Sequence, residues 1–164
     1  MILDANCLIY LAKAELANLC YSLSRKNLVI DSEVYNETVV EGKKIGSIDA
    51  FRIEEFLKDN NIPIIPTNIT KELAIFRDPG EASCSVLCKA GGTCITGDVV
   101  AIKKFARNAQ QAVRIEFFFF QKWLNNEILT DDMREILKKL ENVNAITHER
   151  REFVLDQMEK TKRP

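Results

Sequence analysis

Short apolar runs alternate along this chain with segments in which apolar residues recur at helical spacing. Five runs rich in Ile, Val or Leu predict strands near residues 1–4, 28–31, 62–66, 93–97 and 112–116. Helical patterns fill the intervals, at residues 8–23, 33–41, 48–58, 80–89 and 99–109. Such apolar strands are typical of a parallel sheet that is covered on both faces. The alternation therefore predicts a three-layer, doubly wound α/β fold with right-handed crossovers.

The alternation stops at about residue 116. Beyond it the pattern predicts helices alone, at residues 117–128, 133–140 and 150–159. We therefore expect an α/β domain over residues 1–116 and a helical C-terminal extension over residues 117–164, packed on that domain or on a second subunit.

Aromatic residues are concentrated at the start of this extension. Phe117 to Phe120 are followed by Trp123 and Leu124, which together form a large apolar surface. This surface either fills the core of the protein itself or pairs two subunits, because aromatic clusters are enriched at interfaces. We expect a homodimer on this ground.

Composition and charge narrow the choice of partners. A chain of 164 residues that is 46% hydrophobic is about one domain with a proper core. Its net charge of −1 gives no general attraction to nucleic acid, so a polyanionic substrate would need a local basic patch. A strand pattern begins at Met1, and no apolar run approaches the roughly 18 residues of a membrane span. We expect a cytoplasmic protein without a membrane partner.

The chain has five cysteines, an odd number in a domain that needs no disulfide to fold: Cys7, Cys20, Cys84, Cys88 and Cys94. The spacing of the last three leaves a zinc or iron–sulfur site as an alternative. However, the sequence has no pair of cysteines two residues apart, and its one histidine is distant in the sequence. Reduced, buried thiols are the preferred interpretation.

Two aspartates stand where a predicted strand gives way to a helical pattern. Asp4 follows the first strand and Asp98 follows the fourth. Ligands of open α/β sheets bind at the carboxyl ends of the strands, so adjacent strands would bring these acids into one pocket. Asp4 could instead merely cap the helix after it. Asp31, after the second strand, is a weaker candidate because Asp-Ser is a common helix start.

Two glutamates complete the candidate chemistry. Glu37 lies on a predicted helix, with Glu33 and Glu41 four residues before and after it. Acids at this spacing usually form a solvated face of the helix. The functional alternative is that one end of this face binds a cation. Glu81 follows Asp78-Pro79-Gly80 in the first turn of a helix, where a carboxylate suits the helix dipole. The small residues after Glu81 would also let a ligand approach closely.

Four short motifs appear in an order that strongly resembles the PIN-domain family of metal-dependent nucleases, in particular the VapC-like ribonucleases. They are Leu3-Asp4-Ala5-Asn6, Val34-Tyr35-Asn36-Glu37, Gly80-Glu81-Ala82 and Thr96-Gly97-Asp98. The resemblance covers residues 1 to about 116. It implies that Asp4, Glu37, Glu81 and Asp98 are catalytic, and that Asn6 and Thr96 support the site.

The resemblance also implies Mg²⁺ or Mn²⁺ as the cofactor, held by Asp4, Glu81 and Asp98, while Glu37 binds a second ion or orients water. Clustered carboxylates repel one another unless a divalent cation neutralises them, and oxygen ligands suit these two ions. Such a cation activates water and stabilises charge on a phosphodiester. The implied activity is an endoribonuclease that leaves a 5′-phosphate and a 3′-hydroxyl.

The substrate and the biological role follow from the same comparison. Lys103, Lys104 and Arg107 lie on the helix after Asp98 and are the predicted RNA contacts, although lysines decorate most exposed helices. Small PIN proteins commonly resemble the toxin of a toxin–antitoxin pair, with a small antitoxin protein as partner, while others process or survey RNA. The alternative from another class is a non-catalytic RNA-binding or assembly module that retains the acidic pocket.

Overall fold

Five short parallel strands form the centre of the protein. A computed structural model describes residues 1–161, so the predicted extension is described up to residue 161 only. The strands are β1 (Ile2–Leu3), β2 (Ile30–Asp31), β3 (Ile64–Ile65), β4 (Thr93–Thr96) and β5 (Gln111–Arg114). Each overlaps a predicted strand, and every pairing between them is parallel.

The strands follow one another across the molecule in the order β3-β2-β1-β4-β5. β1, β4 and β5 form one ladder and β2 and β3 form another, joined by a parallel bridge between Ile2 and Val29. From β1 the chain proceeds outward to β2 and β3, then returns past β1 to β4. The direction of winding therefore reverses between β1 and β4, and such a reversal creates a crevice at the carboxyl ends of the two strands.

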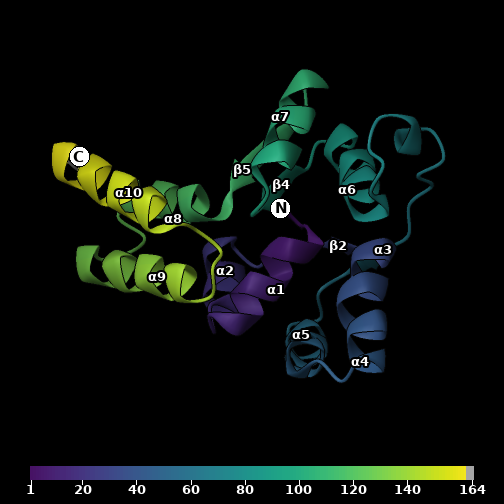
Figure 1. Cartoon of the computed structure of the whole chain (residues 1–164), viewed down its shortest axis with the longest axis horizontal. Helices are drawn as coiled ribbons and strands as arrows, with labels where there is room; N and C mark the ends of the chain where they lie inside the picture. Colours follow the sequence, from purple (N-terminus) through teal and green to yellow (C-terminus); the bar gives the residue numbers. More distant parts are fainter. Residues whose placement is uncertain (162–164) are drawn as a thin grey trace.

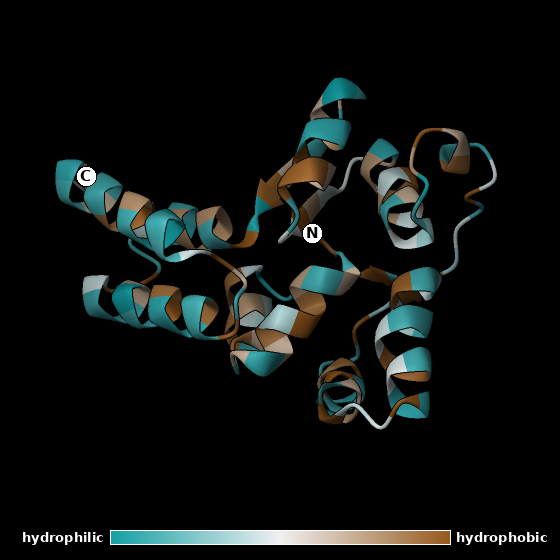
Figure 2. Cartoon of the chain, viewed as in Figure 1, coloured by the Kyte–Doolittle hydropathy of each residue, from teal (hydrophilic) through white to brown (hydrophobic). Residues whose placement is uncertain are grey.

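Helices cover both faces of the strands, which confirms the predicted three-layer α/β fold. Figure 1 shows α6 (Pro79–Lys89) and α7 (Val99–Arg107) on one side, and α1 (Ala5–Lys13), α2 (Ala17–Leu23) and α5 (Ile48–Asp59) on the other. Hydrophobic residues gather on the strands and on the inward faces of these helices, as Figure 2 shows. The strand side chains Leu3, Ile30 and Ile95 are fully buried.

The single helix predicted over residues 8–23 is wrong, because the chain forms α1 and α2 with a sharp break between them. Glu15 adopts the left-handed conformation with φ 56°. The Leu16 amide donates to the Leu11 carbonyl at 2.8 Å and the Glu15 amide donates to the Ala12 carbonyl at 3.2 Å. These two bonds form a Schellman cap, which usually has glycine at the left-handed position. A glutamate there gives no sequence signal for the break.

The helix predicted over residues 33–41 is longer and irregular. It consists of α3 (Ser32–Tyr35), a π-helical segment η1 (Asn36–Glu41) and α4 (Gly42–Lys44). π-helical turns are rare and frequently occur at functional sites. This one carries Glu37. A short 3₁₀ helix, η2 (Glu72–Ala74), lies in the connection before α6 and was not predicted.

The C-terminal extension forms the three predicted helices: α8 (Ile115–Leu124), α9 (Thr130–Asn142) and α10 (His148–Lys160). α8 begins directly after β5 and contacts β4, β5 and α9. Phe118, Phe119 and Trp123 are buried within the chain itself. These three aromatic residues therefore fill the protein's own core, while Phe117, Phe120 and Leu124 are only partly buried. The homodimer stays a prediction.

Two expectations from composition can be compared with the structure. All five cysteines are unpaired and buried, as predicted. Among residues 1–161, no helix is both long and apolar enough to cross a bilayer.

Candidate active site

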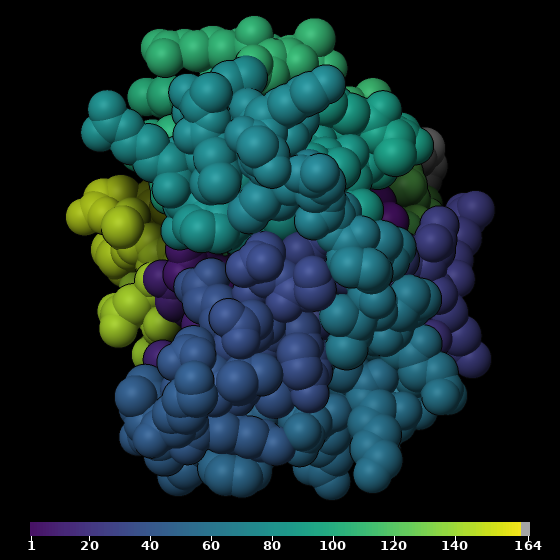
Figure 3. Space-filling view, turned by 90° about the vertical axis from the view of Figure 1, so that its right-hand side faces the viewer, coloured from purple at the N-terminus to yellow at the C-terminus, as the bar shows by residue number. Residues whose placement is uncertain are grey.

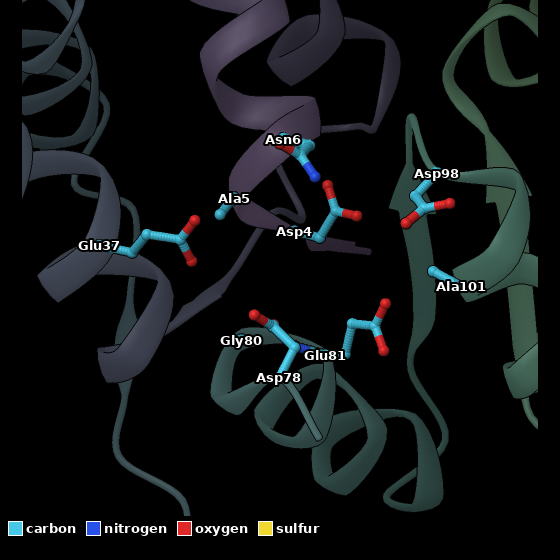
Figure 4. Close-up of a pocket in the computed structure, with 9 residues that line it drawn as sticks. All are labelled: Asp4, Ala5, Asn6, Glu37, Asp78, Gly80, Glu81, Asp98 and Ala101. Atoms are coloured by element: carbon cyan, nitrogen blue, oxygen red, sulfur yellow. The ribbon is translucent and has the colours of Figure 1, made fainter. Parts of the chain in front are cut away.

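A pocket at the crevice between β1 and β4 gathers side chains from four separate parts of the chain. Figure 4 shows its lining, which comprises Asp4, Ala5, Asn6, Glu37, Asp78, Gly80, Glu81, Asp98 and Ala101. The fold thus brings all four predicted catalytic acids together. Asp78 is a fifth carboxylate, although the sequence Asp78-Pro79-Gly80 indicates only a turn. Figure 3 shows the side of the molecule where α6 (teal) lies above α3 to α5 (blue), with atoms from the start of the chain (purple) visible beside them.

Asp4 caps a helix and lines the pocket at the same time. Its Oδ1 accepts a hydrogen bond of 2.7 Å from the Cys7 amide in the first turn of α1. The Thr96 hydroxyl also hydrogen-bonds to the Asp4 carboxylate. Burial raises the pKa of Asp4 to about 7, because the charges of Asp98 and Glu37 add to the cost of desolvation and outweigh these two hydrogen bonds.

Asp98 repeats this arrangement at the end of β4. Its Oδ1 accepts from the Val100 amide at 2.6 Å and caps α7. The buried Thr96 hydroxyl accepts from the Asp98 amide at 2.9 Å. Thr96 therefore lies between the two aspartates, and its supporting role stays a prediction. Asn6 lies on α1 beside Asp4, at the exposed edge of the pocket (Figure 4).

Glu81 enters the pocket from the first turn of α6. Asp78 caps this helix, and its Oδ1 accepts from the Glu81 amide at 2.8 Å. The Glu81 carboxylate forms an ion pair with the ammonium group of Lys104 on α7. This cation is a local counterion for one of the five acids.

Glu37 faces the same pocket from η1, opposite Asp98 (Figure 4). A Cβ atom on Gly80 would lie 3.2 Å from Glu37 Oε2 and 3.2 Å from Asp78 Oδ1, closer than most such contacts. Glycine at this position therefore lets the two carboxylates approach α6. Partial burial and the neighbouring charge of Asp78 raise the pKa of Glu37.

A family model described as a PIN domain matches residues 1–160. The chain belongs to the PIN-domain family. This family consists generally of nucleases, and its members typically use divalent metal ions. Comparisons with curated proteins and with solved structures gave no significant match.

The donor set of this PIN domain fits a hard divalent cation. Every candidate ligand in the pocket is a carboxylate oxygen, the type that Mg²⁺ and Mn²⁺ prefer. Burial raises the pKa of both Asp4 and Glu37, and the charges of neighbouring carboxylates raise it further. Within residues 1–161, no three acidic, histidine or cysteine side chains stand close enough to hold one ion. Asp4, Glu81 and Asp98 would therefore have to draw together around a cation.

Asp31 occupies an equivalent strand end but lies outside this pocket. It follows β2, caps α3 by accepting from the Glu33 amide at 2.7 Å, and is fully buried. Asp31 therefore begins a helix, which is the role that the Asp-Ser sequence predicts.

The three predicted RNA contacts on α7 separate into two groups. Lys103 and Arg107 are exposed. Lys104 points to Glu81 instead and belongs to the acidic pocket. Lys103 and Arg107 remain predicted RNA contacts.

Proposed function

We propose that this PIN domain is a metal-dependent endoribonuclease that hydrolyses RNA phosphodiesters with Mg²⁺ or Mn²⁺. The observation that carries the proposal is that five carboxylates meet at the crevice between β1 and β4, where the winding of the sheet reverses. Asp4, Asp78 and Asp98 each cap a helix. Helix capping does not require these acids to lie in one pocket, and it does not account for Glu37 and Glu81. Bringing them together with Glu37 and Glu81 costs electrostatic energy that a bound cation would offset.

Asp4, Glu81 and Asp98 would hold the cation, and Glu37 faces them across the pocket. The bound ion would supply Lewis-acid activation of water and would neutralise charge on the phosphodiester. Asp4 would bind the ion as a carboxylate, so binding would release the proton that its pKa of about 7 leaves partly bound near neutral pH. Glu81, which pairs with the Lys104 ammonium, would supply a further ligand for the ion.

The remaining residues of the pocket position the reacting groups. Glu37, at the far side of the pocket, is placed to orient the attacking water. Thr96 holds the Asp4 carboxylate through its hydroxyl. Ala5, Gly80 and Ala101 are small and leave room for a phosphodiester between the acids.

Cleavage of an end-labelled single-stranded RNA separates this proposal from a non-catalytic RNA-binding or assembly module. We expect cleavage in Mn²⁺, none in EDTA, and none by Glu81→Gln, with 5′-phosphate and 3′-hydroxyl ends on the products. RNA binding without cleavage in either metal would favour the module.

The resemblance to small PIN toxins supports one biological role. We propose that the chain is the toxin of a toxin–antitoxin pair, restrained by a small protein partner. Induced expression should then arrest growth, and co-expression of the antitoxin should relieve the arrest. Equal arrest by Glu81→Gln would show that it does not come from the nuclease site.

A further inference from the structure

A second charged cluster lies one strand away from the acidic pocket. Glu116, at the start of α8, is fully buried, and its Oε1 accepts from Arg150 Nε on α10 at 2.7 Å. Arg114 Nε, at the end of β5, lies 2.8 Å from the same oxygen. Two guanidinium groups thus share one carboxylate, which leaves the Arg114–Glu116–Arg150 cluster with a net positive charge.

Both arginines keep their outer nitrogens available. Arg150 Nε donates a hydrogen bond to Glu116, whereas Arg114 Nε forms an ion pair with it and no hydrogen bond. Within residues 1–161, no hydrogen bond of their Nη groups is found, and none of these groups is buried without a partner. About a fifth of each side chain is exposed, 19% for Arg114 and 22% for Arg150. The outer edge of a guanidinium group is the edge that binds phosphate oxygens in a bidentate manner.

Aromatic rings hold one of these arginines in place. The Arg150 guanidinium lies 4.3 Å from the ring centre of Phe117 and 4.8 Å from that of Phe153. Phe117 is partly buried, whereas Phe153 is 44% exposed. An exposed ring beside a fixed guanidinium can stack on an unpaired base while the guanidinium binds the adjoining phosphate.

The register of the sheet places this cluster beside the proposed catalytic pocket. Arg114 pairs with Thr96 across β4 and β5, and neighbouring strands lie about 4.8 Å apart. Paired residues project to the same face of a sheet, so the Arg114 side chain leaves on the side of the Thr96 hydroxyl that binds Asp4. An RNA strand that leaves the pocket across β4 and β5 would meet the cluster next.

We propose that Arg114 and Arg150, fixed by Glu116, bind a backbone phosphate of single-stranded RNA next to the scissile one, with Phe153 stacking on the adjoining base. The inference rests on the proposed ribonuclease function and identifies where that site would hold its substrate. Without a bound cation the five acids in the pocket repel a polyanion, so a positive group beside them would favour binding.

RNA affinity in EDTA tests this subsite without cleavage. The test variant is Arg114→Gln/Glu116→Gln/Arg150→Gln, which removes the arginines without leaving Glu116 charged and unpaired. Fluorescence anisotropy with a labelled single-stranded RNA should show a salt slope lower by about 0.7, or about five-fold weaker binding at 0.1 M salt, because the one phosphate contact that is lost contributes about 0.7. Phe153→Ala should weaken binding about five-fold at an unchanged slope.

Arg134→Gln/Lys138→Gln on α9 is the matched control, since it removes two exposed cations away from the cluster. An unchanged slope in the folded triple variant, or an equal loss in this control, would overturn the subsite. If the triple variant does not fold, 4-thiouridine cross-linking of the wild-type protein decides the matter: adducts on residues 150–154 support the subsite, and adducts confined to α7 overturn it.

The outcome is independent of the nuclease assay. Loss of RNA affinity in the triple variant of a protein that does not cleave RNA would support the subsite and contradict the proposed activity. Metal-dependent cleavage with an unchanged salt slope would overturn the subsite alone.

Discussion

Asp4 shows how one side chain can stabilise the fold and serve a reaction. One carboxylate oxygen caps α1, and the side chain lies in a pocket that it shares with four further acids. Capping and chemistry are therefore not alternatives at this position. The same holds for Asp98, which caps α7 and faces the same pocket. Both depend on the geometry of an open α/β sheet, in which a strand ends where a helix begins.

The raised pKa of Asp4 makes the metal-free protein less stable as pH rises. Its pKa is about 7 in the folded protein and 3.8 when unperturbed, so the folded state binds the proton more tightly. This contribution is fully present below about pH 4 and is lost between about pH 4 and 7. Urea unfolding in EDTA should show stability falling over this range, and Asp4→Asn should flatten the fall. An identical pH profile in both proteins would contradict the assignment.

Metal should stabilise the protein through the same residue. A ligand that binds only the folded state at 100 times its Kd adds about 2.7 kcal/mol. Thermal melting should therefore rise with Mn²⁺ in the wild-type protein and much less in Asp4→Asn. The rise should increase from pH 6 to pH 8 because the cation displaces the proton of Asp4. Equal shifts in the two proteins would exclude Asp4 as a principal ligand.

At the scale of elements, α7 presents cations of two kinds. Lys104 pairs with Glu81, whereas Lys103 faces solvent. Lys104→Gln should tighten Mn²⁺ binding up to about five-fold, since ion pairs of this exposure are worth up to about 1 kcal/mol. Lys103→Gln is the matched control: it should leave Mn²⁺ affinity unchanged and lower the salt slope of RNA binding by about 0.7. Calorimetry and anisotropy measure the two effects, and the reverse pattern would refute the division.

The start of α6 carries a second prediction at this scale. Gly80→Ala adds a Cβ atom in the first turn of α6, where crowding offsets the conformational gain over glycine. The new Cβ would crowd the carboxylates of Glu37 and Asp78. Cleavage should fall by about ten-fold, since a misplacement of 1 Å can cost about a hundred-fold. A folded variant that is fully active would show that the close approach of Glu37 is not needed.

The sequence predicted those elements whose signal is local. All five strands and the start of α7 follow from apolar runs and capping acids. The break at Glu15 escaped prediction because a Schellman cap without glycine has no composition signal. The position of Asp78 in the pocket was not predicted for a different reason. The sequence Asp78-Pro79-Gly80 is typical of a helix start and gives no sign of a second role. Contacts distant in sequence, such as Lys104 with Glu81 or Arg150 with Glu116, depend on packing that no pattern displays.

At the scale of the whole molecule, strand order creates the site. The acids after β1 and β4 meet because the chain returns past its first strand, and α6 enters the crevice between them. α8 to α10 extend this framework from β5 and bring the arginine cluster to the same edge of the sheet. The helical extension is therefore continuous with the core and contributes to the proposed RNA surface.

The aromatic residues of α8 should act on stability and not on assembly. Phe119 is fully buried, so Phe119→Ala should cost about 3–5 kcal/mol of unfolding free energy. The homodimer remains a prediction, and sedimentation equilibrium at micromolar concentration tests it against a monomer of 18.7 kDa. Dissociation of a dimer by Phe119→Ala without loss of stability would contradict this account of the aromatic residues.

We expect RNA cleavage to depend on the acids that share the pocket and not on a helix-capping acid outside it. The most direct measurement compares single-turnover RNA cleavage in Mn²⁺ by the wild-type protein, Asp98→Asn and Asp31→Asn. Both aspartates cap a helix at the end of a strand, but only Asp98 lines the pocket. We predict that Asp98→Asn abolishes cleavage while folded Asp31→Asn retains it. Cleavage by Asp98→Asn at the wild-type rate would contradict the account.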